Sequence, residues 1–206
     1  MKLINRGAEA DVYSTMWDKK KAILKIRKKK AYRNSLLDQK IRKQRTSRES
    51  QIISQVKSFG IPTPLIYFVD LNKCSIMMQN IDGKTVRDTQ NNEIVKVCNE
   101  IGKIVGTMHK NGIMHGDLTT SNFLVNKKKL FLIDFGLASR TEKPDDHAVD
   151  LRLFKEILNS AHAKVMENSW KNFQNGYSKA VGPKYCKKVL DLVAVIESRG
   201  RYATVV

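Results

Sequence analysis

The chain has 206 residues, of which 41% are hydrophobic, and a formal net charge of +18. This length suits one domain or two small lobes, and the hydrophobic content excludes disorder along the whole chain. The sequence contains neither a secretion signal nor an apolar run of membrane-spanning length, so we expect a cytoplasmic protein without membrane contact. The cysteines, Cys74, Cys98 and Cys186, lie far apart, and we expect reduced thiols.

The positive charge is concentrated in one segment. Residues 19–48 contain fourteen Lys and Arg side chains against one acid, Asp38. A field this dense attracts phosphate backbones and acidic protein surfaces, although a solvated face is the ordinary explanation of a charge run. We therefore expect contact with a polyanion here.

The first part of the chain predicts a small sheet with one helix. A long basic helix is expected over 36–59, with Leu37, Ile41, Ile52, Ile53 and Val56 as its apolar stripe, and the Gly and Pro residues of 60–64 end it. Strands are predicted over residues 2–6, 10–16, 21–27, 65–70 and 74–79.

The second part predicts a mainly helical unit. Apolar residues between Ile94 and Met108 recur at helical spacing, with Asn91 or Asn92 as the N-cap and a stop at 111–112. Short strands follow over 123–126 and 130–134, and helices are expected after Asp150. The sequence thus predicts an α+β protein with lobes 1–80 and 81–206 and a ligand site in the cleft between them.

Three polar residues in the stretch 114–136 indicate phosphoryl transfer. Asp117 precedes Asn122 by five residues, and Asp134 opens an Asp-Phe-Gly sequence. Asn122 and Asp134 flank the predicted hairpin, so folding would bring together the hard oxygen ligands that Mg²⁺ prefers. Asp117 is placed to accept or orient a proton on the attacking oxygen. His115 is expected to pack under the loop and orient its backbone.

A phosphate-binding lysine is expected on the third strand. The sequence Ala22-Ile23-Leu24-Lys25 resembles the strand lysine pattern of kinases. Its partner should be an acid on the following helix, and of Asp38 and Glu49 we choose Glu49, because it precedes the apolar Ile52 and Ile53. Asp38 is assigned to the basic surface.

The remaining nucleotide contacts are predicted around these groups. Residues 6–12 would cover the phosphates, although they contain one glycine instead of three. The backbone of residues 79 and 81 would meet the adenine edge, whereas core packing is an equal alternative for residues 12, 22 and 124. The candidate nucleotide-binding residues are Ile4, Gly7, Ala8, Glu9, Ala10, Val12, Ala22, Lys25, Gln79, Ile81 and Leu124.

Several segments together resemble a small branch of the protein kinase-like superfamily, the kinase/ATPase subunit of the KEOPS complex. They are RGAEADVY, the basic block from Tyr32 to Ile53, IPTPLIYFVD, MHGDLTTSNFLV, LFLIDFGLA, HAVDL and SRGR. The resemblance implies a bilobal protein kinase-like fold with a reduced helical C-terminal lobe. It also implies ATP and Mg²⁺ as cofactors, Lys25, Glu49 and Asp117 as catalytic residues, and Asn122 and Asp134 as metal ligands.

The function implied is that of an ATPase and Ser/Thr autokinase supporting threonylcarbamoyladenosine modification of tRNA. The expected partners are the threonylcarbamoyl-transferring subunit, on the C-terminal lobe, and tRNA, through residues 19–48 and possibly the C-terminus. Two alternatives stay open: a free-standing atypical Ser/Thr protein kinase and a tRNA-binding module on a kinase scaffold. Against the free-standing kinase, Gly116 replaces the usual Arg and only thirteen residues separate Gly136 from Asp150.

Overall fold

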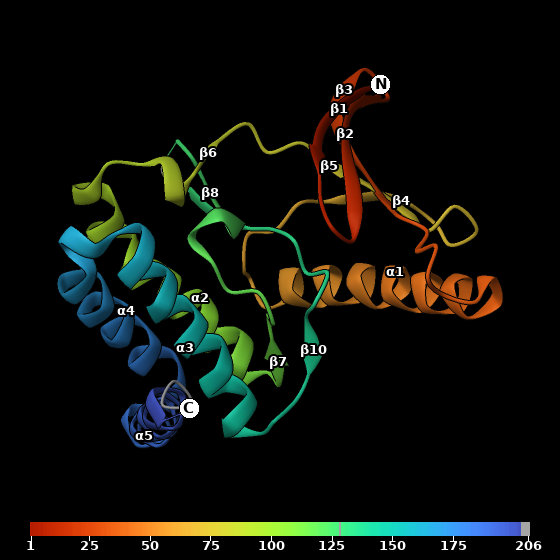
Figure 1. The fold of residues 1–206 in the computed structure, drawn as a ribbon. Helices are drawn as coiled ribbons and strands as arrows, with labels where there is room; N and C mark the ends of the chain where they lie inside the picture. The colour runs from red at the N-terminus through yellow and green to blue at the C-terminus, as the bar shows by residue number, and fades with distance from the viewer. Residues whose placement is uncertain (128, 203–206) are drawn as a thin grey trace. The chain divides into compact units, whose positions relative to one another are not determined.

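The computed structural model describes residues 1–127 and 129–202. The chain divides into two compact units, Met1–Asp82 and Gly83–Val206. The first is a sheet with one helix and the second is mainly helical, as the predicted α+β class requires (Figure 1).

The sheet of the first unit is antiparallel, with strand order β1-β2-β3-β5-β4. Alternating apolar and polar residues form these strands, and each predicted range is confirmed to within one residue at either end. Their bounds are β1 (Lys2–Arg6), β2 (Ala10–Trp17), β3 (Lys20–Arg27), β4 (Ile66–Asp70) and β5 (Ser75–Gln79). β3 lies between two neighbours, so its side chains are held on a well-supported strand.

Helix α1 (Ser35–Ser58) packs against β4 and β5. It begins because the Asn34 side chain accepts hydrogen bonds from the backbone of the first turn. Its C-terminal half buries Ile52, Ile53 and Val56 as predicted. The prediction for Leu37 is wrong, since this side chain is 53% exposed, and the buried position of that turn is Asp38.

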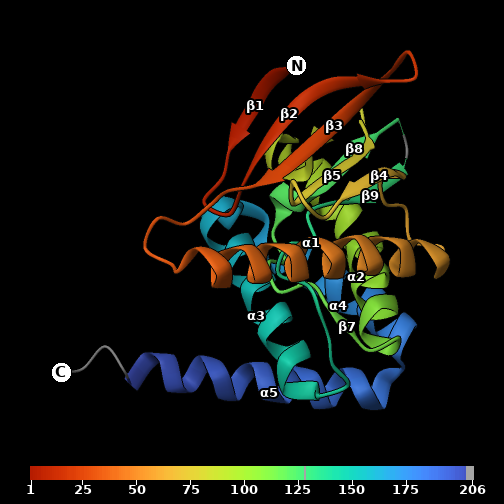
Figure 2. The same ribbon diagram turned by 90° about the vertical axis from the view of Figure 1, so that its right-hand side faces the viewer.

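The second unit is built on α2 (Asn91–Lys110), which packs closely on α4 (Met166–Val181), while α3 (Pro144–Ala161) packs on α5 (Pro183–Tyr202) (Figure 2). The N-cap of α2 is Gln90 without a side-chain cap bond, so the predicted Asn91 or Asn92 cap is wrong. Helix α3 begins before Asp150, because Pro144 suits a first helical turn. The short strands are β6 (Lys84–Thr85), β7 (Ile113–Met114), β8 (Phe123–Asn126), β9 (Lys129–Leu132) and β10 (Ser139–Arg140).

The core of the second unit is aromatic and aliphatic. Phe154 and Phe173 pack with ring centroids 4.7 Å apart, and Phe123 and Tyr177 are fully buried beside them. All three cysteines are free thiols, and the structure places each of them in a buried position. Within the described ranges, none of the helices combines the length and apolarity that a membrane crossing requires.

Candidate active site

The structure brings Lys25 and Glu49 together, as the sequence predicted. Lys25 Nζ donates to Glu49 Oε1 at 2.7 Å, and both side chains are buried. The alternation of β3 directs Lys25 toward α1, where Glu49 lies one turn before Ile52 and Ile53. A third residue joins them, because Arg27 also bonds the Glu49 carboxylate. The cluster is therefore a carboxylate between two cations.

The predicted phosphate-covering segment is a tight turn between β1 and β2. The backbone N–H of Gly7 donates to Ala10 O at 2.9 Å, and a side chain at position 7 would place its Cβ 2.8 Å from that oxygen. The turn is held by cations: Lys30 Nζ donates to Ala8 O at 2.6 Å, and Arg45 donates to Glu9 Oε2 at 2.7 Å. Part of the basic segment thus stabilises this turn.

The other predicted nucleotide contacts in this unit differ in burial. Ala22 is fully buried, Val12 pairs with Lys25 across the strands, and Ile4 is 56% exposed. The Gln79 N–H donates to Leu65 O at 2.8 Å, so this N–H is already used within the sheet. Ile81 follows the end of β5. Leu124, on β8 of the second unit, is partly buried and pairs with Phe131.

The second unit brings Asp117 and Asn122 together. Asn122 Nδ2 donates to the Asp117 backbone oxygen at 2.8 Å and to its Oδ2 at 3.1 Å. With the amide nitrogen committed to Asp117, the amide oxygen of Asn122 faces the other way and is suited to accept a cation.

The β8–β9 hairpin brings Asn122 next to the strand end that carries Asp134. The backbone N–H of Ile133 donates to Asn122 O at 2.9 Å, which places Asp134 one residue beyond. Asp134 has a positive φ of 59°, and its Oδ1 accepts from the Gly136 N–H at 3.2 Å. This conformation is uncommon outside glycine and directs the carboxylate out of the strand.

An amide oxygen and a carboxylate fit Mg²⁺, which is usually bound by one or two protein ligands together with substrate phosphates and water. Within the described residues, no cluster of three His, Cys, Asp or Glu side chains could hold a metal by itself. The donor set therefore suits a metal bound together with a nucleotide and does not suit a closed structural metal site.

Asp150 holds the backbone of the loop that precedes Asp117. Its buried carboxylate accepts from the backbone N–H of His115 at 2.5 Å and of Gly116 at 2.8 Å, and from His109 Nε2 at 3.2 Å. Burial by itself would raise the pKa of Asp150, yet the hydrogen bonds from the His109 ring and from the His115 backbone lower it below its usual value. Asp150 is thus a charged anchor for the loop before Asp117.

His115 supports the loop as predicted. The Asp117 N–H donates to His115 Nδ1 at 3.3 Å, and His115 Nε2 lies 3.2 Å from Ile133 O. Because a backbone N–H can only donate and a carbonyl can only accept, Nδ1 accepts in this arrangement and Nε2 donates. His115 therefore joins the Asp117 loop to the strand that leads to Asp134.

Gly116 has a structural reason to be glycine. Its φ is +77°, and a Cβ would lie 2.5 Å from the backbone oxygen of Leu137. An arginine at this position would require the loop and the segment after Gly136 to separate. The local packing thus accounts for the missing Arg.

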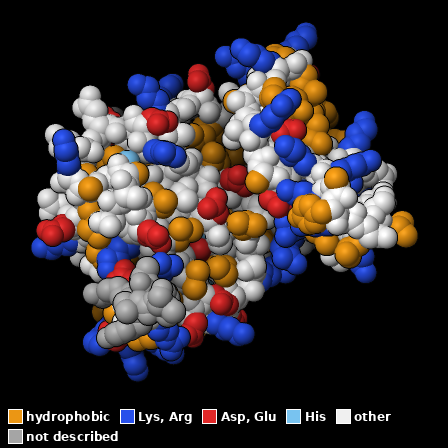
Figure 3. All heavy atoms as spheres, in the orientation of Figure 1, with side chains coloured by type: hydrophobic (Ala, Val, Ile, Leu, Met, Phe, Trp, Pro, Cys, Tyr) orange, Lys and Arg blue, Asp and Glu red, His pale blue; other side chains and the backbone are white. Residues whose placement is uncertain are grey.

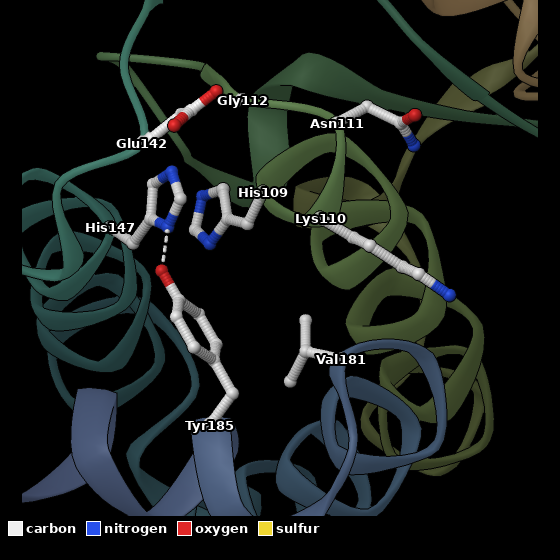
Figure 4. Close-up of a pocket in the computed structure, with 8 residues that line it drawn as sticks. All are labelled: His109, Lys110, Asn111, Gly112, Glu142, His147, Val181 and Tyr185. Carbon is white, nitrogen blue, oxygen red and sulfur yellow. Dashed lines mark hydrogen bonds between the residues drawn. The ribbon is translucent and has the colours of Figure 1, made fainter.

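His109, which bonds Asp150, is stacked on a second histidine, His147. The rings of His109 and His147 are 4.0 Å apart and nearly parallel, at the wall of a pocket of about 490 Å³ (Figure 4). His109 Nδ1 bonds Tyr177 and His147 Nδ1 bonds Tyr185. Burial lowers the pKa of both imidazoles, that of His147 to about 4, so both rings are neutral near pH 7.

The sequence is similar to proteins of known family. Residues 1–160 match the protein kinase domain family. The chain is 37% identical over 212 residues to the KEOPS complex subunit Bud32 of Pyrococcus abyssi, covering 98% of this chain and 96% of that protein. It is 42% identical over 200 residues to a probable bifunctional tRNA threonylcarbamoyladenosine biosynthesis protein of Methanocaldococcus jannaschii.

The chain belongs to the Bud32 family of protein kinase-like proteins. The alignment with the bifunctional relative covers 97% of this chain but only 37% of that protein. This chain therefore corresponds to one part of the longer protein.

Solved structures agree on the fold of this Bud32 family member. The Rio2 kinase–ADP/Mg²⁺–phosphoaspartate complex from Chaetomium thermophilum superposes with a TM-score of 0.66 at 16% identity, covering 98% of this chain and 72% of that one. WaaP in complex with acyl carrier protein gives 0.63 at 14% identity, covering 98% and 88%. At these identities the likeness establishes the protein kinase-like fold and nothing further.

Two residues of this candidate site have no role that the sequence alone predicts. In the sequence, Asp150 belongs to HAVDL and lies fourteen residues after Gly136, and this position was the available signal. Arg27 is one of the fourteen Lys and Arg residues of 19–48. Alternation along β3 places Arg27 on the face of Lys25, but only the burial of its side chain distinguishes Arg27 from the other cations of this segment.

Proposed function

We propose that this chain is an ATP-hydrolysing and autophosphorylating subunit of a KEOPS-like assembly that supports threonylcarbamoyladenosine modification of tRNA. The observation that carries the proposal is the Asp117–Asn122 pair next to Asp134, in a chain that matches a KEOPS subunit over 96% of that subunit's length. The names of the relatives supply the biological setting, and the residues supply the chemistry.

The chemistry needs few groups, because phosphoryl transfer depends chiefly on positioning and charge neutralisation. Asn122 and Asp134 would hold Mg²⁺, which when bound neutralises charge on the phosphates of ATP. Lys25, positioned by Glu49, would bind phosphate oxygens. As water or a Ser/Thr hydroxyl bonds to the γ-phosphorus and the bond to the β-phosphate oxygen breaks, Asp117 accepts the proton of the attacking oxygen and ADP leaves.

The basic segment supports contact with tRNA once its side chains are sorted by burial. Arg27, Arg42 and Arg45 are committed to carboxylates of this unit. The exposed cations are therefore the proposed phosphate contacts, and Lys and Arg side chains are spread over the visible face of this unit (Figure 3). These exposed cations are Lys19, Lys20, Lys21, Lys29, Lys40 and Arg48.

The partner is proposed to be another KEOPS subunit, the threonylcarbamoyl-transferring one, contacting the Gly83–Val206 unit. At the C-terminus, Arg199 is exposed, whereas the side chain of Arg201 and residues 203–206 lie outside the described part. A contribution of the C-terminal tail to tRNA binding therefore stays a prediction from the sequence.

The deciding experiment measures ATP turnover and tRNA modification with the partner subunit and tRNA present. Asp134→Ala and Asp117→Asn should lower both by at least about a hundredfold, the scale of positioned catalytic groups. Asp145→Ala, which removes an exposed carboxylate from α3, is the matched control and should leave both unchanged. Unchanged turnover and modification in Asp134→Ala would overturn the mechanism.

Two alternatives give different results in the same assay. A tRNA-binding module without catalysis, favoured by the exposed cations alone, would bind tRNA with the same salt dependence in Asp134→Ala and support modification without ATP turnover. A free-standing protein kinase would phosphorylate added proteins repeatedly when the chain is isolated from its partner.

A further inference from the structure

Glu49 is bound by two cations in the first unit. Its Oε1 accepts from Lys25 Nζ at 2.7 Å, while its Oε2 accepts from Arg27. Exposure is 2% for Glu49, 9% for Lys25 and 5% for Arg27, so the cluster is shielded from water. A lone buried pair would use one carboxylate oxygen and leave the other to be solvated. In this cluster, Arg27 is the partner of the second oxygen, Glu49 Oε2.

The backbone of Arg27 is part of the sheet, so its side chain starts from a fixed position. Arg27 ends β3, and its backbone N–H donates to Cys74 O at 3.0 Å. Lys25 and Arg27 are two residues apart on one strand, so their side chains leave the same face and reach the same carboxylate on α1. A second contact, Arg45 to Glu9, joins α1 to the turn before β2. Helix α1 is thus fixed to the sheet by ion pairs at two points.

We infer that Arg27 is a positioning residue that keeps Glu49, and through it Lys25 Nζ, in the phosphate-binding arrangement before any nucleotide binds. The inference rests on the proposed function, in which Lys25 binds phosphate oxygens. Arg27 also brings the summed charge of the three side chains to +1, which favours an approaching polyphosphate. Nucleotide therefore meets a preassembled Lys25 and does not have to order α1 by itself.

The form of the contact suggests a rescue experiment. Arg27 reaches Glu49 through one terminal nitrogen, and its Nε has no hydrogen-bond partner among the residues that the structure describes. A lysine offers one charged nitrogen at a similar reach, so Arg27→Lys should preserve the contact, whereas Arg27→Met keeps bulk and loses charge. Lys73→Met removes a charge from an exposed turn of the same unit and is the matched control.

The first measurement separates KM for ATP from kcat in the assembled complex. We expect Arg27→Met to raise KM about tenfold, the equivalent of losing one charge-assisted hydrogen bond, with a smaller change in kcat. Arg27→Lys should return KM to within about twofold of the wild type, and Lys73→Met should not change it. An unchanged KM in Arg27→Met, or a lysine variant as impaired as the methionine variant, would overturn the inference.

The second measurement is hydrogen exchange of the unliganded chain. Amides near Glu49 in α1 should exchange faster in Arg27→Met than in wild type and at the wild-type rate in Arg27→Lys. Equal exchange in all three chains also overturns the inference. This arm needs no ATP chemistry: if wild type neither binds nor hydrolyses ATP, the proposed function fails while the exchange rates still decide the role of Arg27.

Discussion

The two units hold their charged groups in place in different ways: one through ion pairs between side chains and the other through hydrogen bonds to the backbone. In Met1–Asp82, the side chains proposed to serve phosphate binding bond one another directly, with Glu49 between Lys25 and Arg27. In Gly83–Val206, the backbone near Asp117 is held from behind by Asp150 and His115, which lie under the loop. A cation for phosphates can be buried if a carboxylate compensates it, whereas metal ligands and a base must keep oxygen atoms accessible. The loop is therefore fixed through its backbone.

The largest effect should come from removing the loop anchor. Asp150→Ala leaves the N–H groups of His115 and Gly116 and the His109 ring without a buried acceptor, and we expect a loss of about 4 kcal/mol in the stability of the second unit. Activity should fall with it. Urea unfolding followed by Trp170 in a Trp17→Phe background reports this unit, since the chain has two tryptophans.

The control for Asp150→Ala is Asp145→Ala on the same helix, whose carboxylate is exposed. A loss below about 1 kcal/mol in Asp150→Ala would show that water replaces the carboxylate and that the loop is not anchored as argued.

A somewhat smaller effect is expected at the ion cluster of the first unit. Glu49→Gln keeps the shape but leaves two buried cations facing a neutral amide, and the cost should be about 3 kcal/mol. Trp17 fluorescence in a Trp170→Phe background follows this unit. If the Trp17 transition stays at the wild-type urea concentration, the comparison between directly paired and backbone-held charges is wrong for this unit.

The stability of the second unit should depend on pH through the stacked histidines. Burial lowers the pKa of His147 to about 4, and repulsion from His109 in its protonated form is the second cause. The ordinary value is about 6.5. Because the unfolded chain then binds protons more readily, stability is complete above about pH 6.5 and falls toward pH 4, by about 3 kcal/mol for this shift.

His147→Phe keeps a stacked ring without a titrating nitrogen, so its unfolding free energy should change less between pH 7 and 4.5 than that of wild type. The comparison uses the slope with pH and is independent of the absolute stability of the variant. Equal slopes would mean that other groups cause the acid sensitivity.

The smallest effect is expected where an ion pair is exposed. Lys187 Nζ and Asp191 Oδ2 are 2.8 Å apart on α5, but both side chains are largely in water. Lys187→Ala should change stability by no more than about 0.5 kcal/mol. A loss comparable to that of Glu49→Gln would contradict the view that burial, rather than distance, decides what these charges contribute.

Local patterns in the sequence were enough for much of the fold. Alternation located the five strands of the sheet, and turn residues bounded α1. The Leu37 prediction failed because periodicity cannot tell an apolar stripe from a buried ion pair, and Asp38 with Arg42 fills that turn. The N-cap prediction for α2 failed because the residue preference for N-caps favours Asn91 and Asn92 equally, whereas the helix begins one residue earlier, directly after Gln90.

The sequence by itself determined which chemical groups are available: Lys25, Glu49, Asp117, Asn122 and Asp134 stand out by type and spacing. Only the tertiary structure decided what supports them. Arg27 is one of many cations until burial selects it, and Asp150 is an ordinary helix acid until it lies under the Gly116 backbone. Spacing along a chain reports local geometry, whereas burial and contacts between distant residues exist only once the chain has folded.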